Sequence, residues 1–525
     1  MTSGCVLRAA RPLLGRAVVA CSVGAAMPSV ADPAEPRFEP VPLPEHVYSG
    51  GWEHFVGGGV AVLDCDGDRL PELFAAGGEA PAVLMRNRGG MRFEAEPTGL
   101  RGVVGAYPLD LDGDGHLDLA VLRVGPDLLL RGGPDCAFAP FEEGPFADPR
   151  LSGGDAWTTA FSATWEDDLP TLAFGRYVDR TDPDGPFEAC DDTLLFRPSE
   201  GAYGGPLRLE GHCALSMLFT DWGRGGRPDL RVSNDRHYYV TGGQEQMWAM
   251  EDPPRLYGEA HGWRRHELWG MGIASRDLDG DGRPEVYLTS MGDQRLQSLE
   301  PGARGPSYAD AGFERGATAH RPHLGGDGRP STGWHPAFGD VDNDGRDDLF
   351  VSKGNVEQMP GLAMEDPDSL LMQRRDGTFV EAAGGAGVAS TARGRGAALV
   401  DLDLDGRLDL VVVQRRAPML AHRNVTEAGA WVGLELAQQS PNGRAVGAWI
   451  ELEADGRRHA REVTVGGGHA GGTAGPEHFG LGTAGAARVR VIWPDGTTSE
   501  WTPLAPGGYA TLRRGEATTL AVEPW

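Results

Sequence analysis

The stretch that decides the fold is Asp110-Leu111-Asp112-Gly113-Asp114-Gly115-His116-Leu117-Asp118, with carboxylates at its first, third, fifth and ninth positions. Closely spaced oxygen ligands suit Ca²⁺, which takes roughly six to eight oxygens. The glycines let the backbone turn tightly around an ion. The apolar run Leu119-Ala120-Val121-Leu122 that follows is typical of a strand. The stretch therefore predicts a calcium-binding loop that leads directly into a strand.

This acidic loop recurs along the chain. Complete copies also begin at positions 64, 277, 340 and 401. The copy that begins at 221 keeps only its outer acids, and the copy that begins at 163 keeps only the frame. The copies follow one another at roughly fifty to sixty residues, which indicates a repeat architecture. We number the seven copies as loops 1 to 7 in chain order, so loops 3 and 4 are the decayed ones. The predicted calcium ligands are Asp64, Asp66, Asp68 and Glu72 (loop 1), Asp110, Asp112, Asp114 and Asp118 (loop 2), Asp277, Asp279, Asp281 and Glu285 (loop 5), Asp340, Asp342, Asp344 and Asp348 (loop 6), and Asp401, Asp403, Asp405 and Asp409 (loop 7).

Short apolar runs precede and follow each loop. Residues 59–63 and 73–76 flank loop 1, and two further strand-like runs follow before the next loop. Four short strands per repeat, separated by turn residues, fit one blade of a β-propeller. Closure of the ring would also remove exposed sheet edges. The sequence therefore predicts an all-β fold with a seven-bladed β-propeller over residues 57–425. A lead-in segment, 32–56, would supply or brace a closing strand.

The pattern changes after position 424. Alternating strand-like runs occupy residues 431–436, 447–452, 461–465 and 488–493, with no acidic loop among them. This part predicts a small β-rich domain over 430–516, followed by a C-terminal tail over 517–525.

The first 31 residues read as a secretory signal peptide. Arg8, Arg11 and Arg16 form a basic lead, residues 17–27 are a short apolar stretch, and Ser29-Val30-Ala31 offers a cleavage site. An alternative is a lipid anchor through Cys21. No later stretch is long and apolar enough to span a bilayer. We therefore expect a secreted, periplasmic or cell-surface protein.

Charge and cysteine content give further information about partners and disulfides. The formal net charge is −28, which argues against nucleic acid as a partner because phosphate binding needs a basic patch. Beyond the signal peptide, Cys190 and Cys213 flank one hairpin-like segment and are predicted to pair. Cys65 and Cys136, in neighbouring repeats, are a second candidate pair.

The loops resemble the FG-GAP or VCBS repeats of integrin-α-like β-propellers. The C-terminal part is similar to the ASPIC/UnbV domain in three pieces, residues 442–448 (NGRAVGA), 478–482 (HFGLG) and 491–497 (VIWPDGT). Together they look like the bacterial relatives of cartilage acidic protein. The resemblance implies a secreted calcium-binding propeller, with each ion between the first two strands of a blade. It does not extend metal binding to loops 3 and 4, where Ala163, Trp165, Gly223 and Gly225 replace carboxylates.

Two functional hypotheses follow. The first is an extracellular binding or adhesion module for protein or polysaccharide, without catalysis, in which calcium is structural. The second is an exported metalloenzyme. Residues 302–336 read as a long insertion in which His320, His323 and His335 could bind a transition metal, with His237 as a further candidate. Neither a Gly-x-Ser-x-Gly elbow nor a Walker loop occurs.

Overall fold

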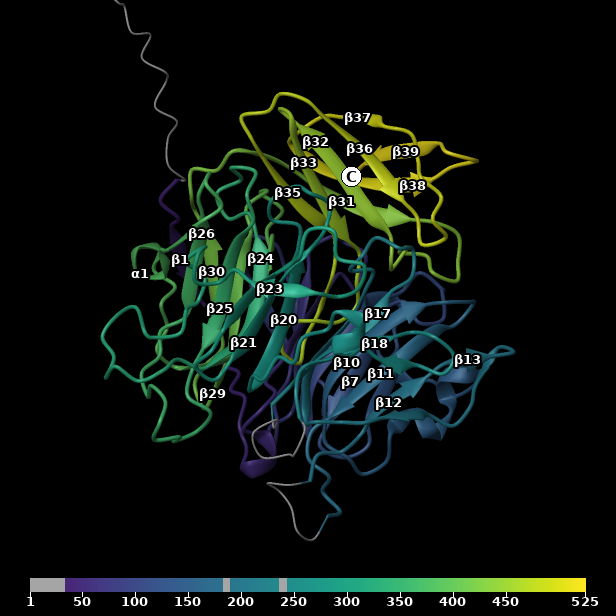
Figure 1. Ribbon diagram of the computed structural model, residues 1–525, viewed down its shortest axis with the longest axis vertical. Helices are drawn as coiled ribbons and strands as arrows, with labels where there is room; N and C mark the ends of the chain where they lie inside the picture. Colours follow the sequence, from purple (N-terminus) through teal and green to yellow (C-terminus); the bar gives the residue numbers. More distant parts are fainter. Residues whose placement is uncertain (1–33, 183–188, 236–242) are drawn as a thin grey trace, which may run out of the picture. The chain divides into compact units, whose positions relative to one another are not determined.

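The computed structural model describes residues 34–182, 189–235 and 243–525, and nearly all of its regular structure is β-strand (Figure 1). The predicted signal peptide, Cys21 and His237 lie outside the described residues. None of the described helices has the length and apolar character needed to cross a membrane. The described helical elements are α1 (Ala383–Ala386) and the 3-10 turns η1 (Trp52–His54), η2 (Pro134–Cys136), η3 (Pro145–Ala147), η4 (Pro149–Ser152) and η5 (Glu259–His261).

Seven of the described sheets are built on four antiparallel strands, and we number them 1 to 7 with their loops. The strands follow chain order in each sheet except sheet 7, where β1 is the outer strand. A small hairpin, β13 (Pro198–Ser199) and β14 (Ala202–Tyr203), interrupts sheet 3. The strands are β2 (Val60–Leu63), β3 (Glu72–Ala75), β4 (Val83–Asn87) and β5 (Phe93–Pro97) in sheet 1; β6 (Val103–Leu109), β7 (Asp118–Arg123), β8 (Leu128–Arg131) and β9 (Ala139–Pro140) in sheet 2; β10 (Thr158–Trp165), β11 (Pro170–Arg176), β12 (Thr193–Phe196) and β15 (Leu207–Leu209) in sheet 3; β16 (Ala214–Thr220), β17 (Asp229–Asn234), β18 (Gln246–Ala249) and β19 (Arg255–Leu256) in sheet 4; β20 (Gly270–Arg276), β21 (Glu285–Ser290), β22 (Arg295–Leu299) and β23 (Tyr308–Asp310) in sheet 5; β24 (Gly333–Gly339), β25 (Asp348–Lys353), β26 (Ser369–Gln373) and β27 (Phe379–Glu381) in sheet 6; and β28 (Arg393–Val400), β29 (Asp409–Arg415), β30 (Leu420–Asn424) and β1 (Phe38–Val41) in sheet 7.

The first strands of the sheets form a closed series. Each contacts the first strand of the next sheet, and β28 of sheet 7 contacts β2 of sheet 1. This is the architecture of a β-propeller. Loops 1, 2, 4, 5, 6 and 7 join the first strand of a sheet to the second, and loop 3 is the turn of the β10–β11 hairpin. The positions of the loops in the sequence therefore mark the turns between the first two strands of the sheets.

Strand β1 comes from the N-terminal lead-in and completes sheet 7. It pairs antiparallel with β30, with Phe38 opposite Asn424 and Val41 opposite Ala421. The ring is thus closed by strands from both ends of the propeller sequence. This pairing covers what would otherwise be an exposed edge of β30.

The C-terminal domain consists of two four-stranded sheets over one apolar core. Residues 517–525, which the sequence reading took as a tail, contain the edge strand β39, whose register with β38 runs from Arg514–Leu520 to Ala510–Pro524. The domain therefore extends to the last described residues. Its strands are β35 (Glu477–Gly482), β31 (Ala430–Ala437), β38 (Gly508–Arg514) and β39 (Leu520–Pro524) in one sheet, and β33 (Arg457–Glu462), β32 (Trp449–Ala454), β36 (Ala487–Ile492) and β37 (Thr502–Leu504) in the other.

The insertion predicted over 302–336 is shorter than expected. Its first part contains β23, the outer strand of sheet 5, and its last residues begin β24, the first strand of sheet 6. The connection between these strands is therefore 311–332. The sequence reading missed β23 because Tyr308-Ala309-Asp310 is too short to show a clear alternation.

A glycine-rich segment of the C-terminal domain, residues 465–475, enters the centre of the ring. We call it the central segment. It includes β34 (Thr473–Ala474), which pairs parallel with β2, and it forms isolated bridges to β6, β10, β16 and β20. The backbones approach so closely that a side chain would not fit; a Cβ added at Gly471 would lie 2.3 Å from the carbonyl oxygen of Val60.

Candidate metal centres

The five complete loops share a hydrogen-bond pattern that draws their carboxylates together. In loop 2, Asp110 accepts backbone N–H groups from Gly113 at 2.8 Å and from Gly115 at 3.2 Å. Asp118 begins the second strand and accepts the N–H of Leu111 at 2.7 Å. The equivalent first and ninth acids are Asp64 and Glu72, Asp277 and Glu285, Asp340 and Asp348, and Asp401 and Asp409. In loops 6 and 7 the first acid accepts the N–H of the fifth residue in place of that of the fourth.

The resulting clusters have the dimensions of a cation site. In several loops, three carboxylates each offer an oxygen atom within 4.8 Å of the others. An ion with ligands at about 2.3–2.6 Å spans such a gap, and a donor set made only of oxygen suits Ca²⁺. The triads are Asp64, Asp66 and Glu72; Asp110, Asp112 and Asp118; Asp277, Asp279 and Glu285; and Asp340, Asp342 and Asp344.

Burial makes the ninth acid of each loop difficult to ionise. It raises the pKa of Glu72 to about 8, and the pKa values of Asp118 and Glu285 to about 7. Desolvation is the main cause, and like charges in the same loop add to it, as Asp66 does for Glu72. A bound cation would reverse this effect by stabilising the ionised carboxylates.

Three of the loops also contact an arginine that the sequence reading did not single out. In each case it comes from the end of the third strand of the same sheet. Arg86 lies 3.2 Å from Asp66, Arg131 lies 2.9 Å from Asp112, and Arg423 lies 2.8 Å from Asp403. Each arginine offsets part of the negative charge that four carboxylates would leave around a divalent ion. An arginine at that strand position is the sequence signal that could have identified them.

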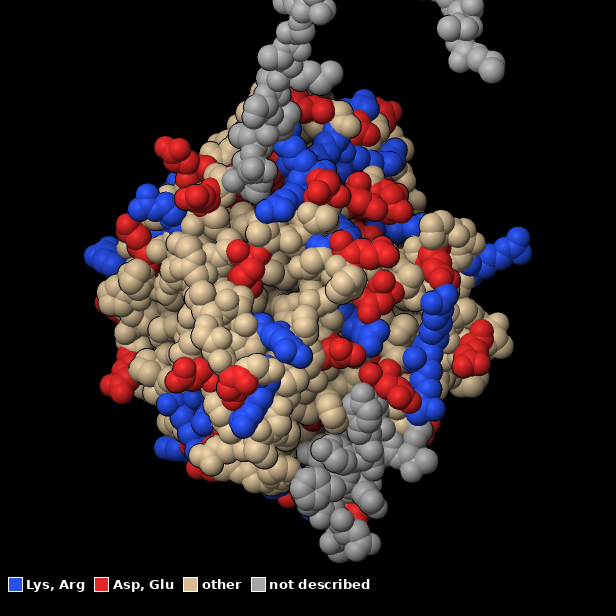
Figure 2. Space-filling view, turned by 60° about the vertical axis from the view of Figure 1, so that its left-hand side comes forward, with Lys and Arg blue, Asp and Glu red and all other residues tan. Residues whose placement is uncertain are grey.

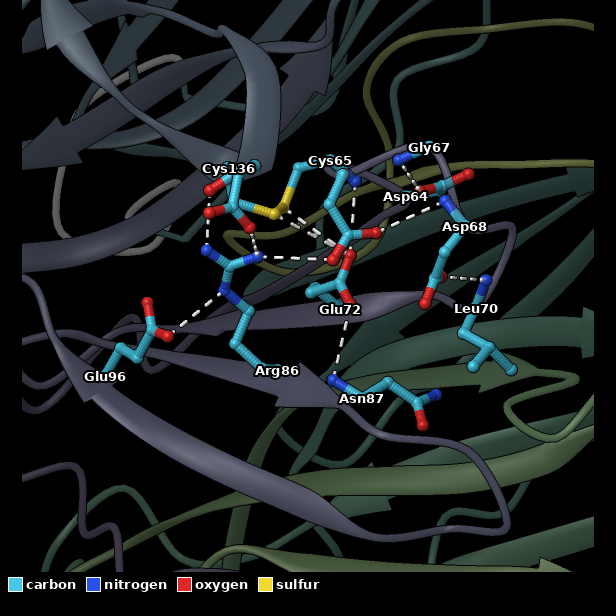
Figure 3. Close-up of a disulfide and its surroundings, with 12 residues drawn as sticks. Asp64, Cys65, Gly67, Asp68, Leu70, Glu72, Arg86, Asn87, Glu96 and Cys136 are labelled. Carbon is cyan, nitrogen blue, oxygen red and sulfur yellow. Dashed lines mark hydrogen bonds and ion pairs between the residues drawn. A yellow bond between two sulfur atoms is a disulfide. The ribbon is translucent and has the colours of Figure 1, made fainter.

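Loop 1 has a further constraint, a disulfide between Cys65, its second residue, and Cys136 of sheet 2 (Figure 3). The Glu72 carboxylate lies below the disulfide and accepts the N–H of Cys65 at 3.2 Å. Arg86 reaches from β4 to Asp66 at 3.2 Å and to Asp135 at 3.0 Å. The disulfide and this arginine therefore tie loop 1 to the neighbouring sheet. The second disulfide, Cys190–Cys213, is the pair predicted from the sequence.

We expect the double variant Cys65→Ser, Cys136→Ser to lose about 2–4 kcal/mol of stability, because the disulfide closes a long loop, its cysteines being 71 positions apart in the sequence. It should also weaken one calcium site, because loop 1 loses its tie to sheet 2. Calorimetric titration with Ca²⁺ and chemical denaturation measure the two effects. Cys190→Ser, Cys213→Ser is the matched control, since that disulfide joins residues outside the acidic loops. Equal calcium titrations for the two variants would contradict the prediction.

The decayed loop 4 contacts the C-terminal domain. Arg224, the fourth residue of this loop, stacks on Trp449 at 4.2 Å and pairs with Glu451 at 2.6 Å. The backbone N–H of Asp221 donates to Glu462 at 2.7 Å. In loop 3, Glu166 instead accepts hydrogen bonds from Thr171 and Arg197. In both decayed loops, the remaining polar groups therefore bind other parts of the protein.

The three histidines proposed as a transition-metal site have separate partners. His320 bonds to Thr318 at 2.8 Å, and His323 lies 3.3 Å from Glu381. His335 is on β24, where its Nδ1 accepts the backbone N–H of His469 at 3.0 Å. The described structure therefore gives no support to a shared metal centre. His335 instead fixes the central segment, an interaction the sequence reading missed.

His469 anchors the central segment in its neutral form. Its Nε2 accepts the N–H of Gly57 at 3.1 Å, so the proton resides on Nδ1, which donates to the carbonyl of Met271 at 2.9 Å. Burial is the main cause that lowers the pKa of His469 to about 3 and that of His335 to about 4. In the unfolded chain a histidine titrates near 6.5.

This difference predicts acid sensitivity. The stability that neutral His469 contributes is complete above pH 6.5 and is lost as the pH falls toward its folded value of about 3. Between pH 7.5 and 5 the loss should be about 2 kcal/mol. His469→Asn keeps a donor for Met271 but does not titrate. We expect it to be less stable than wild type at pH 7.5, with a gap about 2 kcal/mol smaller at pH 5. Denaturant unfolding at the two pH values measures the gap, and a constant gap would refute the titration of His469.

Two models of known sequence families match this chain, one in the propeller and one in the C-terminal domain. A model of the FG-GAP-like repeat matches residues 64–121, which contain loops 1 and 2. A model described as ASPIC and UnbV matches residues 438–519, most of the C-terminal domain. The chain therefore combines an FG-GAP-like repeat with a C-terminal ASPIC/UnbV domain, as the resemblance implied.

Human cartilage acidic protein 1 is a weak relative. It is 29% identical over 153 residues, which are 27% of this chain and 20% of the human protein. The alignment thus spans about a fifth of that protein's length. Distant similarity also extends to two solved structures. One is BBS1N in complex with ARL6DN, with a TM-score of 0.41 and 10% identity over 74% of this chain and 97% of the other. The other is Trypanosoma rangeli sialidase in complex with sialic acid, with a TM-score of 0.37 and 10% identity over 91% and 92%.

Proposed function

We propose that this protein is an exported calcium-binding β-propeller that acts as an extracellular binding or adhesion module for protein or polysaccharide. The observation that carries the proposal is the repeated loop in which oxygen-only carboxylate sets converge between the first two strands of a sheet. Two disulfides add support for export, because such bonds persist in oxidising compartments. The FG-GAP-like and ASPIC/UnbV matches agree with a binding module.

A structural role for calcium follows from where the carboxylates lie. The ninth acid of each complete loop is buried at the start of a strand, with at most 5% of its surface exposed. An ion held there would join the first two strands of a sheet, which is a structural role. The histidine contacts described above give the metalloenzyme alternative no comparable support.

The surface agrees with a partner other than nucleic acid. Figure 2 shows acidic and basic side chains intermixed over the face it presents, with broad uncharged areas between them. The chain as a whole carries a net charge of −28. A protein or polysaccharide partner does not require the extended basic patch that a nucleic acid would.

Metal analysis after chelation and calcium refilling tests the proposal. We expect about five Ca²⁺ ions per chain and no stoichiometric copper, iron or zinc. A retained transition metal would favour the metalloenzyme instead. For the binding role, immobilised glycans and extracellular proteins are probed in 2 mM Ca²⁺ and in excess chelator. Absence of any calcium-dependent binder would contradict the module.

A further inference from the structure

A pocket of about 320 Å³ lies at the end of the ring that is opposite the acidic loops. Each of these loops precedes a second strand, so the opposite end of a sheet is where its second strand ends. The lining includes the residues that directly follow four of the second strands, namely Tyr177 after β11, Asp235 after β17, Met291 after β21 and Arg416 after β29. The volume falls within the range of small-molecule sites. We call it the apolar pocket.

The apolar pocket takes its name from the side chains that line it. Three are methionines and three are aromatic. Methionine sulfur makes favourable contacts with aromatic rings, and aromatic rings pack edge to face. Phe55 and Tyr177 already make such a contact, with their ring centroids 5.8 Å apart. A lining of this kind suits an aromatic ring. The six side chains are Met271, Met291, Met359, Trp52, Phe55 and Tyr177.

Two of these side chains are exposed to solvent. Trp52 and Met359 keep 48% and 37% of their surface exposed, and they are two of the six large hydrophobic residues with such exposure in the described part of the chain. Trp52 packs on Phe55 with the ring centroids 4.6 Å apart, which fixes the orientation of its ring. Exposed apolar surface beside a cavity is typical of a ligand-binding site. A ligand there would cover surface that the fold leaves open to water.

The charged groups of the lining leave no net charge for a ligand to neutralise. Arg415 and Arg416 both pair with Glu357, at 2.8 Å and 2.6 Å. The fourth charged residue, Asp235, accepts the hydroxyl hydrogen of Tyr177. A charged ligand would lose water without gaining an opposite charge, and a sugar would lose water from several hydroxyl groups against an apolar wall. The lining therefore favours an uncharged ligand with few polar groups.

We propose that the apolar pocket binds a small uncharged aromatic molecule of the size of indole or a phenol. Its ring packs against the methionine side chains and against Trp52. The ligand replaces water over the exposed parts of Trp52 and Met359, which is the source of its binding free energy. This goes beyond the proposed function, because the site lies at the other end of the ring from the acidic loops and requires no metal ion.

The test is calorimetric titration of the full chain in 2 mM Ca²⁺ with indole, and with tryptamine and indole-3-acetate as cationic and anionic probes that carry the same ring. We expect indole to bind with a Kd below about 1 mM. Each charged probe should bind at least about tenfold more weakly, because its charge would be desolvated without a new partner. Methyl β-galactoside, an uncharged sugar, should give no binding signal.

Two substitutions locate the site. Trp52→Ala and Met359→Ala should each weaken indole binding about tenfold, a loss of about 1.4 kcal/mol. Both side chains are partly exposed, so we expect both variants to fold, and thermal unfolding checks this. Phe313→Ala and Met364→Ala are the matched controls, because these side chains are 89% and 40% exposed and lie outside the described lining.

Four results would overturn the inference. They are failure of indole to bind, a charged probe that binds as tightly as indole, folded Trp52 and Met359 variants with unchanged affinity, and an equal loss of affinity in the control variants. Calcium content measured on the same samples tests the proposed function separately. Normal calcium content without indole binding would therefore contradict this inference alone.

Discussion

Removal of calcium should lower the unfolding temperature of the protein by about 10 °C. For an assumed dissociation constant of about 10⁻⁴ M, typical of extracellular sites, 2 mM Ca²⁺ stabilises each site by about 1.8 kcal/mol. Five independent sites contribute about 9 kcal/mol. A folded body of this size has an unfolding entropy of about 1 kcal/mol per kelvin, from about 2.1 cal/mol/K per residue, so each kcal/mol shifts the midpoint by about 1 °C.

The physical cause is the concentration of carboxylates that the fold imposes. Each complete loop presents four acids, and burial of the ninth raises its pKa, as for Glu72 at about 8. Differential scanning calorimetry in 2 mM Ca²⁺ and in excess chelator measures the shift. If the midpoint does not move, calcium is not what stabilises these loops.

Two variants locate this effect. Asp112→Asn removes one ligand of loop 2 and should reduce the calcium-dependent shift by about one fifth. Gly223→Ala lies in the decayed loop 4, where an added Cβ meets no atom within 4 Å, and should leave the shift unchanged. A reduced shift in Gly223→Ala would mean that the decayed loop still binds an ion.

The second large effect is expected in the central segment. Gly471→Ala should destabilise the protein by about 1–3 kcal/mol or more, because overpacking forces a backbone shift. Its added Cβ would lie 2.3 Å from the carbonyl oxygen and 2.8 Å from the nitrogen of Val60, both backbone atoms of β2. The φ angle of Gly471 is outside the left-handed region, so the effect is purely steric. Equilibrium unfolding in denaturant measures it.

Gly475→Ala is the matched control in the same segment. An added Cβ there meets nothing within 4 Å, and the backbone again does not require glycine. We expect a change within about 0.5 kcal/mol, the range of ordinary surface substitutions. Similar destabilisation by both variants would mean that loss of glycine flexibility, and not the approach to β2, determines the cost.

The repeat made much of this fold predictable. Carboxylates at fixed positions mark the turn between two strands, so the loop starting at Asp110 located β6 and β7 before any other element was known. The same reasoning identified the carboxylate clusters, because ligand spacing within a loop is local in sequence. The change of pattern after position 424 indicated a separate β-rich domain, but it missed β39, whose short run Leu520–Pro524 resembles a tail.

Long-range contacts were not predictable in this way. Arg86, Arg131 and Arg423 approach the loops from the ends of third strands, a position that the sequence shows, but the ligand spacing within a loop does not reveal the contact. His335 was read by its spacing from His320 and His323, but its partner His469 is 134 residues away. The position of the central segment inside the ring was missed because a run of glycines, considered without its neighbours in the fold, indicates only a flexible chain. Only the contact with β2 shows that they are required by close backbone packing.

The entry of the central segment into the ring has a consequence for biosynthesis. During synthesis β2 leaves the ribosome long before β34, the strand that pairs with it inside the ring, because β34 lies more than four hundred positions later in the sequence. Strand β1 likewise cannot pair until β30, its partner in sheet 7, has been synthesised. Neither the rim nor the middle of the ring can therefore be finished while the chain is still short. The nascent protein must keep its early strands competent for pairing until nearly all of it has emerged. A stalled or truncated product would present a hollow, unfinished ring to chaperones and proteases.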